Sequence, residues 1–203
     1  ILTQCPGVLA DYLAVESRNI VAVGVGLQHD PQFKSFAKFD LRGKTVIPGL
    51  VDAHTHFYFW ALSFSRVSLQ GCGSLEACLR RIKKYADTLP PNSWVVGEGY
   101  SPEAYKKRVN PDHKMLDRVT AGRPAFIFSK DEHTAWVNSA AMELAGINRL
   151  TPEPAGGRIE RDAHGHPTGI LRESPAYAPV YRLLPKTGER EMRRLWHQAL
   201  GIA

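Results

Sequence analysis

The sequence of 203 residues predicts an α/β protein in which helices cover a parallel β-sheet. Two observations predict this class. Between residues 48 and 146, short apolar runs alternate with stretches in which apolar residues recur at helical spacing. The strand-like runs are apolar throughout, which is typical of strands that are buried on both faces of a parallel sheet.

Residues 1–47 are predicted to form a small β-rich segment. The run 20–27 is a candidate strand, and 38–47 alternates polar and apolar residues around a tight turn at 42–44. From Pro48 the pattern changes. Residues 49–56 are predicted to be a strand that ends in polar residues, and the next element is a helix over 74–89 with Ser74 as its N-cap.

Two further strand and helix pairs follow. Strands are predicted at 94–99 and 124–129, and helices at 110–119 and 138–146, with Asn110 and Asn138 as N-caps. The segment 156–173 is predicted to be a β-hairpin with strands at 158–161 and 168–172, and a last helix runs over 187–203. About three β/α units fit into 48–146, whereas a complete eight-unit barrel needs about 250 residues.

Composition narrows the class of partner. The net charge is +6, but the basic residues are scattered or lie on helix faces without interleaved aromatic residues, so we expect no nucleic-acid partner. No apolar run approaches the ~20 residues of a membrane span, so no membrane partner is expected. Three cysteines are few and odd in number, which fits a reducing compartment and predicts a cytoplasmic protein.

The end of the predicted strand at 49–56 carries two histidines. In a strand, Asp52, His54 and His56 share one face. Two imidazoles on one face can bind a single divalent ion, and imidazole nitrogen suits zinc. Asp52 is a candidate to accept the second N–H of a ligating histidine, or it anchors the strand. The sequence therefore predicts His54 and His56 as metal ligands, with Asp52 behind them.

Four stretches together resemble a known family. They are "GKTVIPGLVDAHTHF" (43–57), "WVVGEGY" (94–100), "DEHTAWVNSAAMELAGI" (131–147) and "GGRIERDAHGHPTGILRE" (156–173). They are similar to the amidohydrolase superfamily, in its family 3 branch, which includes N-substituted formamide deformylases. The resemblance implies that 48–203 is the first part of a metal-dependent-hydrolase TIM barrel with a hairpin insertion near 156–173. It also implies that 1–47 belongs to a composite β-sandwich.

The same resemblance implies hydrolysis of amide-type C–N bonds in a small molecule, with one or two divalent ions, Zn²⁺ being the expected metal. His54 and His56 match metal ligands of the family. His133 matches a motif histidine and is expected to orient the substrate or stabilise the tetrahedral intermediate; its alternative is a loop histidine bonded to backbone. Glu173 is expected to play a polar role in the pocket, or to form an ion pair with Arg172 or another neighbour.

The family pattern continues beyond residue 203 with a lysine, two histidines and an aspartate that have no counterpart here. The chain is therefore expected to be an N-terminal portion, a fragment whose own activity is open. An unclosed barrel exposes a strand edge, so a second copy or a complementing chain is an expected partner. Two alternatives remain open. One is a TatD-like nuclease or phosphoesterase, although the β-rich leader argues against it. The other is a non-catalytic fragment or interaction module with a vestigial site.

Overall fold

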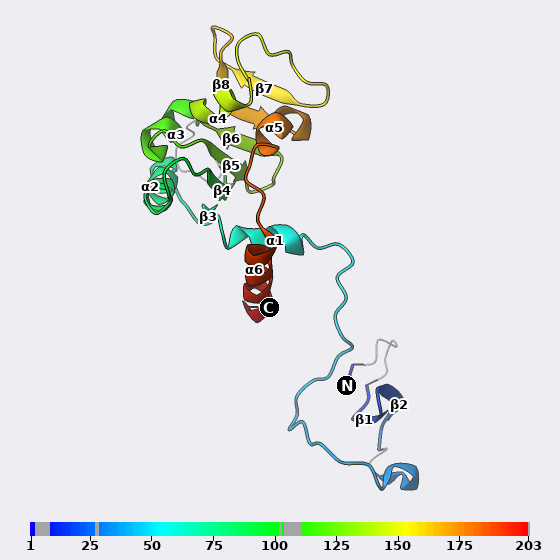
Figure 1. Cartoon of the computed structure of the whole chain (residues 1–203). Coiled ribbons are helices and arrows are strands. Elements are labelled where there is room, and N and C mark those ends of the chain that lie inside the picture. The colour runs from blue at the N-terminus through cyan, green and yellow to red at the C-terminus, as the bar shows by residue number, and fades with distance from the viewer. Residues whose placement is uncertain (3–8, 27–28, 102, 104–110, 203) are drawn as a thin grey trace. The chain divides into compact units, whose positions relative to one another are not determined.

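The computed structural model describes residues 1–2, 9–26, 29–101, 103 and 111–202. These residues form two compact units, Ile1–Thr55 and His56–Ala203, which are described separately (Figure 1). None of the described helices is both long and apolar enough to cross a bilayer. Cys72 and Cys78 are buried free thiols, and Cys5 lies outside the described residues.

The first unit contains an antiparallel hairpin. Strand β1 (Tyr12–Glu16) pairs with β2 (Asn19–Gly24), so the strand predicted from residue 20 is present but shorter. A short 3₁₀ helix, η2 (Pro31–Phe33), follows, with Asp30 as its cap. The tight turn predicted at 42–44 is confirmed: Arg42 has φ 51°, and the amide of Lys44 donates to the carbonyl of Leu41 at 3.0 Å.

Two strand predictions in this unit were wrong. Residues 38–47 and 49–56 form no strand, and Leu50 and Val51 are 90% and 91% exposed. An apolar run becomes a strand only where a neighbouring strand pairs with its backbone N–H and C=O groups. No described strand pairs with these residues, so their apolar composition alone does not produce the element.

The second unit is built on a six-stranded mixed sheet, in the order β3-β4-β5-β6-β8-β7. The first three strands are parallel, as predicted, and the last three are antiparallel. The predicted hairpin is confirmed as β7 and β8. The strand bounds are Val67–Ser68 (β3), Val95–Tyr100 (β4), Ala125–Ser129 (β5), Thr134–Val137 (β6), Arg158–Arg161 (β7) and Pro167–Arg172 (β8).

Helices begin where the sequence supplies a cap. Ser74 accepts from the amide of Ala77 at the start of α2, and Asn138 caps α4, both as predicted. Helix α3 begins later than predicted, because Asp112 is its cap; Asn110 lies outside the described residues. The helix bounds are Phe57–Ser63 (α1), Leu75–Ala86 (α2), His113–Thr120 (α3), Ser139–Leu144 (α4), Ser174–Tyr181 (α5) and Glu189–Ile202 (α6).

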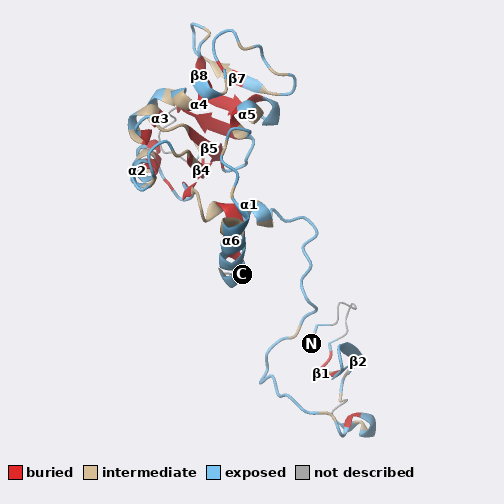
Figure 2. Cartoon of the chain, viewed as in Figure 1, coloured by how far each residue is buried: buried red, intermediate tan, exposed pale blue. Residues whose placement is uncertain are grey.

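Both faces of the sheet are buried (Figure 2). Alternate residues of β5 enter different clusters: Ile127 packs with residues of α2 and α3, and Phe126 packs with residues of α4 and α5. A third cluster joins α1 to α6 through Leu62 and Leu195. Burial on both sides explains why the strands are apolar throughout, and it leaves the strand ends as the places where polar side chains reach solvent.

Candidate functional site

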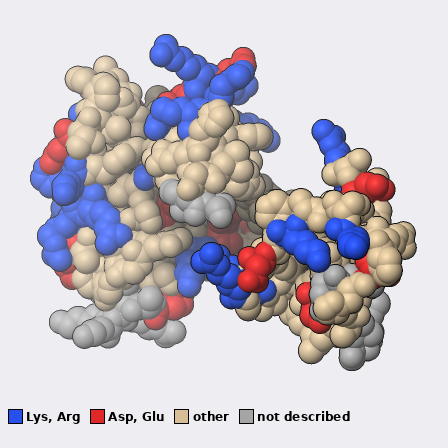
Figure 3. Space-filling model, turned by 90° about the horizontal axis from the view of Figure 1, so that it is seen from below, with Lys and Arg blue, Asp and Glu red and all other residues tan. Residues whose placement is uncertain are grey.

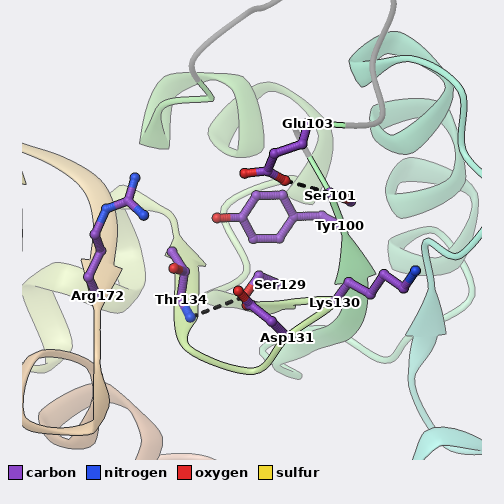
Figure 4. Close-up of a pocket in the computed structure, with 8 residues that line it drawn as sticks. All are labelled: Tyr100, Ser101, Glu103, Ser129, Lys130, Asp131, Thr134 and Arg172. Atoms are coloured by element: carbon purple, nitrogen blue, oxygen red, sulfur yellow. Dashed lines mark hydrogen bonds between the residues drawn. The ribbon is translucent and has the colours of Figure 1, made fainter.

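A cavity of about 320 Å³ lies where four strands of the sheet come to one edge (Figure 4). Tyr100 ends β4 and Ser129 ends the parallel strand β5. Because β6 is antiparallel to β5, its first residue, Thr134, lies at the same edge, and so does Arg172 at the end of β8. The remaining lining residues are Ser101, Glu103, Lys130 and Asp131.

A hydrogen-bonded loop closes one side of this cavity. The Ser129 hydroxyl donates to Asp131 Oδ1 at 2.5 Å and accepts from the amide of Thr134 at 3.0 Å. Asp131 Oδ1 also accepts from the amide of His133 at 3.2 Å. The bond from Ser129, followed by that from His133, holds the pKa of the Asp131 carboxyl below its usual value. Asp131 is therefore an anion whose position the loop fixes.

Tyr100 lines another side of the cavity. This residue is 2% exposed, and its ring centroid lies 5.7 Å from that of Trp136. Burial raises the pKa of the Tyr100 phenol well above its ordinary value, although the nearby Arg172 opposes the rise. The hydroxyl is therefore protonated at neutral pH and available as a donor.

The two residues predicted from the sequence to act in the pocket contact each other. His133 Nδ1 lies 3.0 Å from Glu173 Oε2, and the amide of Glu173 donates to the carbonyl of His133 at 2.7 Å. The hydrogen bond that the Glu173 carboxylate accepts from His133 is the main cause that raises the pKa of His133. Both side chains are exposed, and each is adjacent in sequence to a lining residue, Thr134 or Arg172.

Of the alternative partners expected for Glu173, Arg172 or another neighbour, the structure pairs it with a neighbour, His133. Arg172 instead pairs with Glu160, with Nε 2.6 Å from Oε1. Glu173 has φ 64° and occupies the N-cap position of α5, so the backbone turns sharply after β8 and directs the carboxylate toward His133. The pair therefore links the start of β6 to the end of β8.

The predicted metal ligands lie in a segment without regular structure. The His54 amide donates to Asp52 Oδ1 at 3.0 Å, which makes a local turn in place of the expected strand. His56 occupies the N-cap position of α1, and its ring centroid lies 6.1 Å from that of Phe59. His54 belongs to the first unit and His56 begins the second.

The donors only partly fit a metal centre. Imidazole nitrogen suits zinc, but catalytic zinc generally has three protein ligands. Among the described residues, no group of three or more His, Cys, Asp or Glu side chains could hold an ion. His54 and His56 thus have the right chemistry, but the described part of the chain does not complete the site.

Sequence reasoning overlooked Asp131, Thr134 and Arg172 as lining residues. No strand is predicted from the sequence at Thr134–Val137, the residues of β6, and without that strand these side chains are not expected at one edge of the sheet. The available signal was the short run Thr134–Val137, which is buried throughout and directly precedes the cap Asn138.

Comparison with known proteins shows the family to which this chain belongs. A family model described as "Amidohydrolase family" matches residues 38–201, so the chain belongs to the amidohydrolase family. The chain is 39% identical over 139 residues to the N-substituted formamide deformylase of Arthrobacter pascens, a match covering 68% of this chain and 26% of that protein. It is 36% identical over 137 residues to the putative amidohydrolase YtcJ of Bacillus subtilis (strain 168), covering 66% and 25%. The family predicted from the motifs is confirmed.

The fold is also found among solved structures. An uncharacterized metal-dependent hydrolase from Pyrococcus furiosus superposes with a TM-score of 0.52 at 22% identity, covering 92% of this chain and 36% of that one. This likeness confirms the α/β fold. The chain spans about a quarter of the length of the two curated relatives named above.

Proposed function

We propose that the protein hydrolyses amide-type C–N bonds of small molecules with the help of a divalent ion, zinc being the ion that its histidines suit best. The observation that carries the proposal is the family match over 38–201. It includes both the His54 and His56 pair and the strand ends where the structure gathers polar side chains. In a TIM barrel, that end of the strands is the catalytic face.

We assign separate roles in this reaction to the residues of this chain. His54 and His56 would hold the ion, with Asp52 fixing the backbone of His54. The ion would supply Lewis-acid polarisation of the amide carbonyl and make water more acidic. His133, held by Glu173, would donate a hydrogen bond to the substrate carbonyl. We further propose that the remaining donors come from a second copy or a complementing chain, and that the protein is cytoplasmic.

Metal binding tests the first half of this proposal. We expect about one zinc per chain by elemental analysis after dialysis against zinc, and no zinc in the His54→Ala/His56→Ala variant. The hairpin offers a matched control, since His164 and His166 have the same spacing but lie in the turn held by Asp162. The His164→Ala/His166→Ala variant is expected to keep the ion. Equal zinc content in all three chains would contradict the proposed ligands.

Turnover tests the second half. We expect formate release from an N-substituted formamide, abolished by His54→Ala/His56→Ala, and no cleavage of bis(p-nitrophenyl) phosphate. Cleavage of the phosphodiester alone would overturn the proposal in favour of the nuclease or phosphoesterase class. Turnover of neither substrate by a zinc-loaded chain would favour the non-catalytic alternative.

The surface charge also argues against the nuclease alternative. On the face in Figure 3, Lys and Arg occur in several separate groups with Asp and Glu among them, whereas a nucleic-acid-binding surface usually has a continuous basic stripe.

A further inference from the structure

We propose that the cavity at the ends of β4, β5, β6 and β8 is a subsite for a carboxylate, which Arg172, Tyr100 and Thr134 would bind together. The cavity volume of about 320 Å³ is at the lower end of ligand pockets, so the ligand is a small molecule. The binding site itself does not depend on the proposed function. Only the substrate class that we infer from it, amides that carry a carboxylate, rests on that function.

Two hydroxyl groups of buried residues are open to the cavity. Tyr100 and Thr134 are 2% and 8% exposed, and both line the cavity. Within the described part of the chain, neither hydroxyl has a hydrogen-bond partner, although the backbone groups of both residues are bonded. Among the described residues, no buried side-chain nitrogen or oxygen lacks a hydrogen-bond partner, so these two hydroxyls are accessible from the cavity. Each can therefore donate a hydrogen bond to a ligand that enters the cavity.

Arg172 supplies the charge. Glu160 accepts from its Nε at 2.6 Å, which fixes the guanidinium, while the terminal nitrogens have no partner among the described residues. A guanidinium fork matches the two oxygens of a carboxylate. In the close-up, the hydroxyl of Tyr100 points toward the side of the cavity where Arg172 lies (Figure 4).

The remaining lining groups leave three donors for a ligand. Both carboxylates of the lining accept hydrogen bonds from neighbours: Asp131 from Ser129 and from the amide of His133, and Glu103 from the hydroxyl of Ser101 at 3.3 Å. The ammonium of Lys130 points away from Arg172 and from the hydroxyl of Tyr100 (Figure 4). Among the described lining residues, the two hydroxyls and the terminal guanidinium nitrogens can therefore donate to a ligand, and a carboxylate can accept from all of them.

Titration of the zinc-free chain with three probes tests the subsite. Benzoate, benzamide and benzylammonium share a ring and differ in charge, and binding is followed by calorimetry. We expect benzoate to bind with a Kd in the millimolar range and benzamide at least about tenfold more weakly, because it lacks the charge-assisted bond. Benzylammonium is expected not to bind. Equal affinity for benzoate and benzamide would overturn the proposal.

Single substitutions test which side chains bind the carboxylate. Arg172→Gln is expected to weaken benzoate binding by about tenfold or more, and Tyr100→Phe and Thr134→Val by about threefold to tenfold each. Arg158→Gln is the matched control, since it removes the same charge from the residue paired with Arg172 on β7 and does not line the cavity. It should change the Kd by less than about twofold. Tyr100→Phe keeps the ring that packs on Trp136, so its folding is preserved.

The outcomes separate the subsite from the hydrolase proposal. Benzoate binding that depends on Arg172, in a chain that releases no formate, supports the subsite while the proposed function fails. Formate release by a chain that does not bind benzoate overturns the subsite alone. Unchanged benzoate affinity in both Arg172→Gln and Tyr100→Phe also overturns it.

Discussion

The His133–Glu173 pair shows how two exposed side chains acquire a defined geometry. Each residue lies next to a strand end, and the register of the sheet pairs Thr134 with Arg172, their immediate neighbours. The backbone bond between Glu173 and His133 fixes the separation of the two residues, and the side chains then meet at 3.0 Å. The orientation of His133 is therefore set by backbone pairing rather than by burial.

The Glu173→Gln substitution tests this pair. We expect the pKa of His133 to fall toward its ordinary value of about 6.5, because the substitution removes the bond and the charge that raise it. An NMR titration of the imidazole signal measures the shift. Glu132→Gln is the control, since Glu132 contributes less to raising this pKa than Glu173 does. An unchanged His133 pKa in Glu173→Gln would contradict the observed contact.

The same pair predicts the direction of a pH effect on stability. A histidine with a raised pKa in the folded state stabilises that state below the unfolded pKa, and the contribution disappears as the pH rises through the folded pKa. The difference in unfolding free energy between the wild type and Glu173→Gln should therefore be larger at about pH 5.5 than at about pH 9. Denaturant unfolding at the two pH values measures it, and a difference that grows with pH would contradict the assignment.

At the scale of elements, Asn138 joins three of them. Its Oδ1 accepts from the amide of Ala125, at the start of β5, at 2.9 Å, and from the amide of Ala141 in α4 at 3.0 Å. Its Nδ2 donates to Thr120, in α3, at 3.1 Å and to the carbonyl of Arg123 at 2.8 Å. The residue is 1% exposed, so water cannot replace these bonds if the side chain is removed.

We expect Asn138→Ala to lower the free energy of unfolding by about 3 kcal/mol, since it leaves several buried groups unpaired and also removes a cap. Ser74→Ala removes the cap of α2, which makes a single bond to Ala77, and is expected to cost about 1 kcal/mol. Urea unfolding of both variants measures the contrast. A loss in Asn138→Ala no larger than that in Ser74→Ala would show that the network adds nothing to the cap.

Elements with strong local signals were predictable from the sequence. Helix α2 has an apolar face and a capping serine, and the β7–β8 hairpin has its turn residues, so both were found. Helix α5 was not, because Pro175 and Pro179 argue against a helix. Pro175 is tolerated since it occupies the first turn, where its missing N–H has no intrahelical acceptor.

The candidate site was predictable only in part. His133 and Glu173 were identified by the resemblance, but their contact depends on the register of β6 with β8, which is a long-range property that local sequence does not encode. The cavity depends on the same register. The strand expected at 49–56 does not form for a related reason, since strand formation needs a partner strand and not only an apolar run.

At the scale of the whole molecule, the end of the first unit differs from everything that follows it. Residues 37–55 are exposed at almost every position and contain no helix or strand. Phe39, Leu50 and Val51 are apolar and yet 87%, 90% and 91% exposed. The proposed second copy or complementing chain would account for this exposure, because a partner would cover these apolar side chains.

This contrast predicts the order of proteolysis. Trypsin should cleave first after Arg42 or Lys44, because these residues lie in an exposed local turn outside any helix or strand, and such backbone enters a protease site readily. The basic residues of α2, such as Arg80 and Lys83, lie in a helix whose other face is in the core, so cleavage there requires local unfolding. Mass spectrometry of a time course should show a product that begins at Gly43 or Thr45 and persists. In the Arg42→Gln/Lys44→Gln variant that early product should disappear, whereas early cleavage within α2 would show that the second unit is not the more stable of the two.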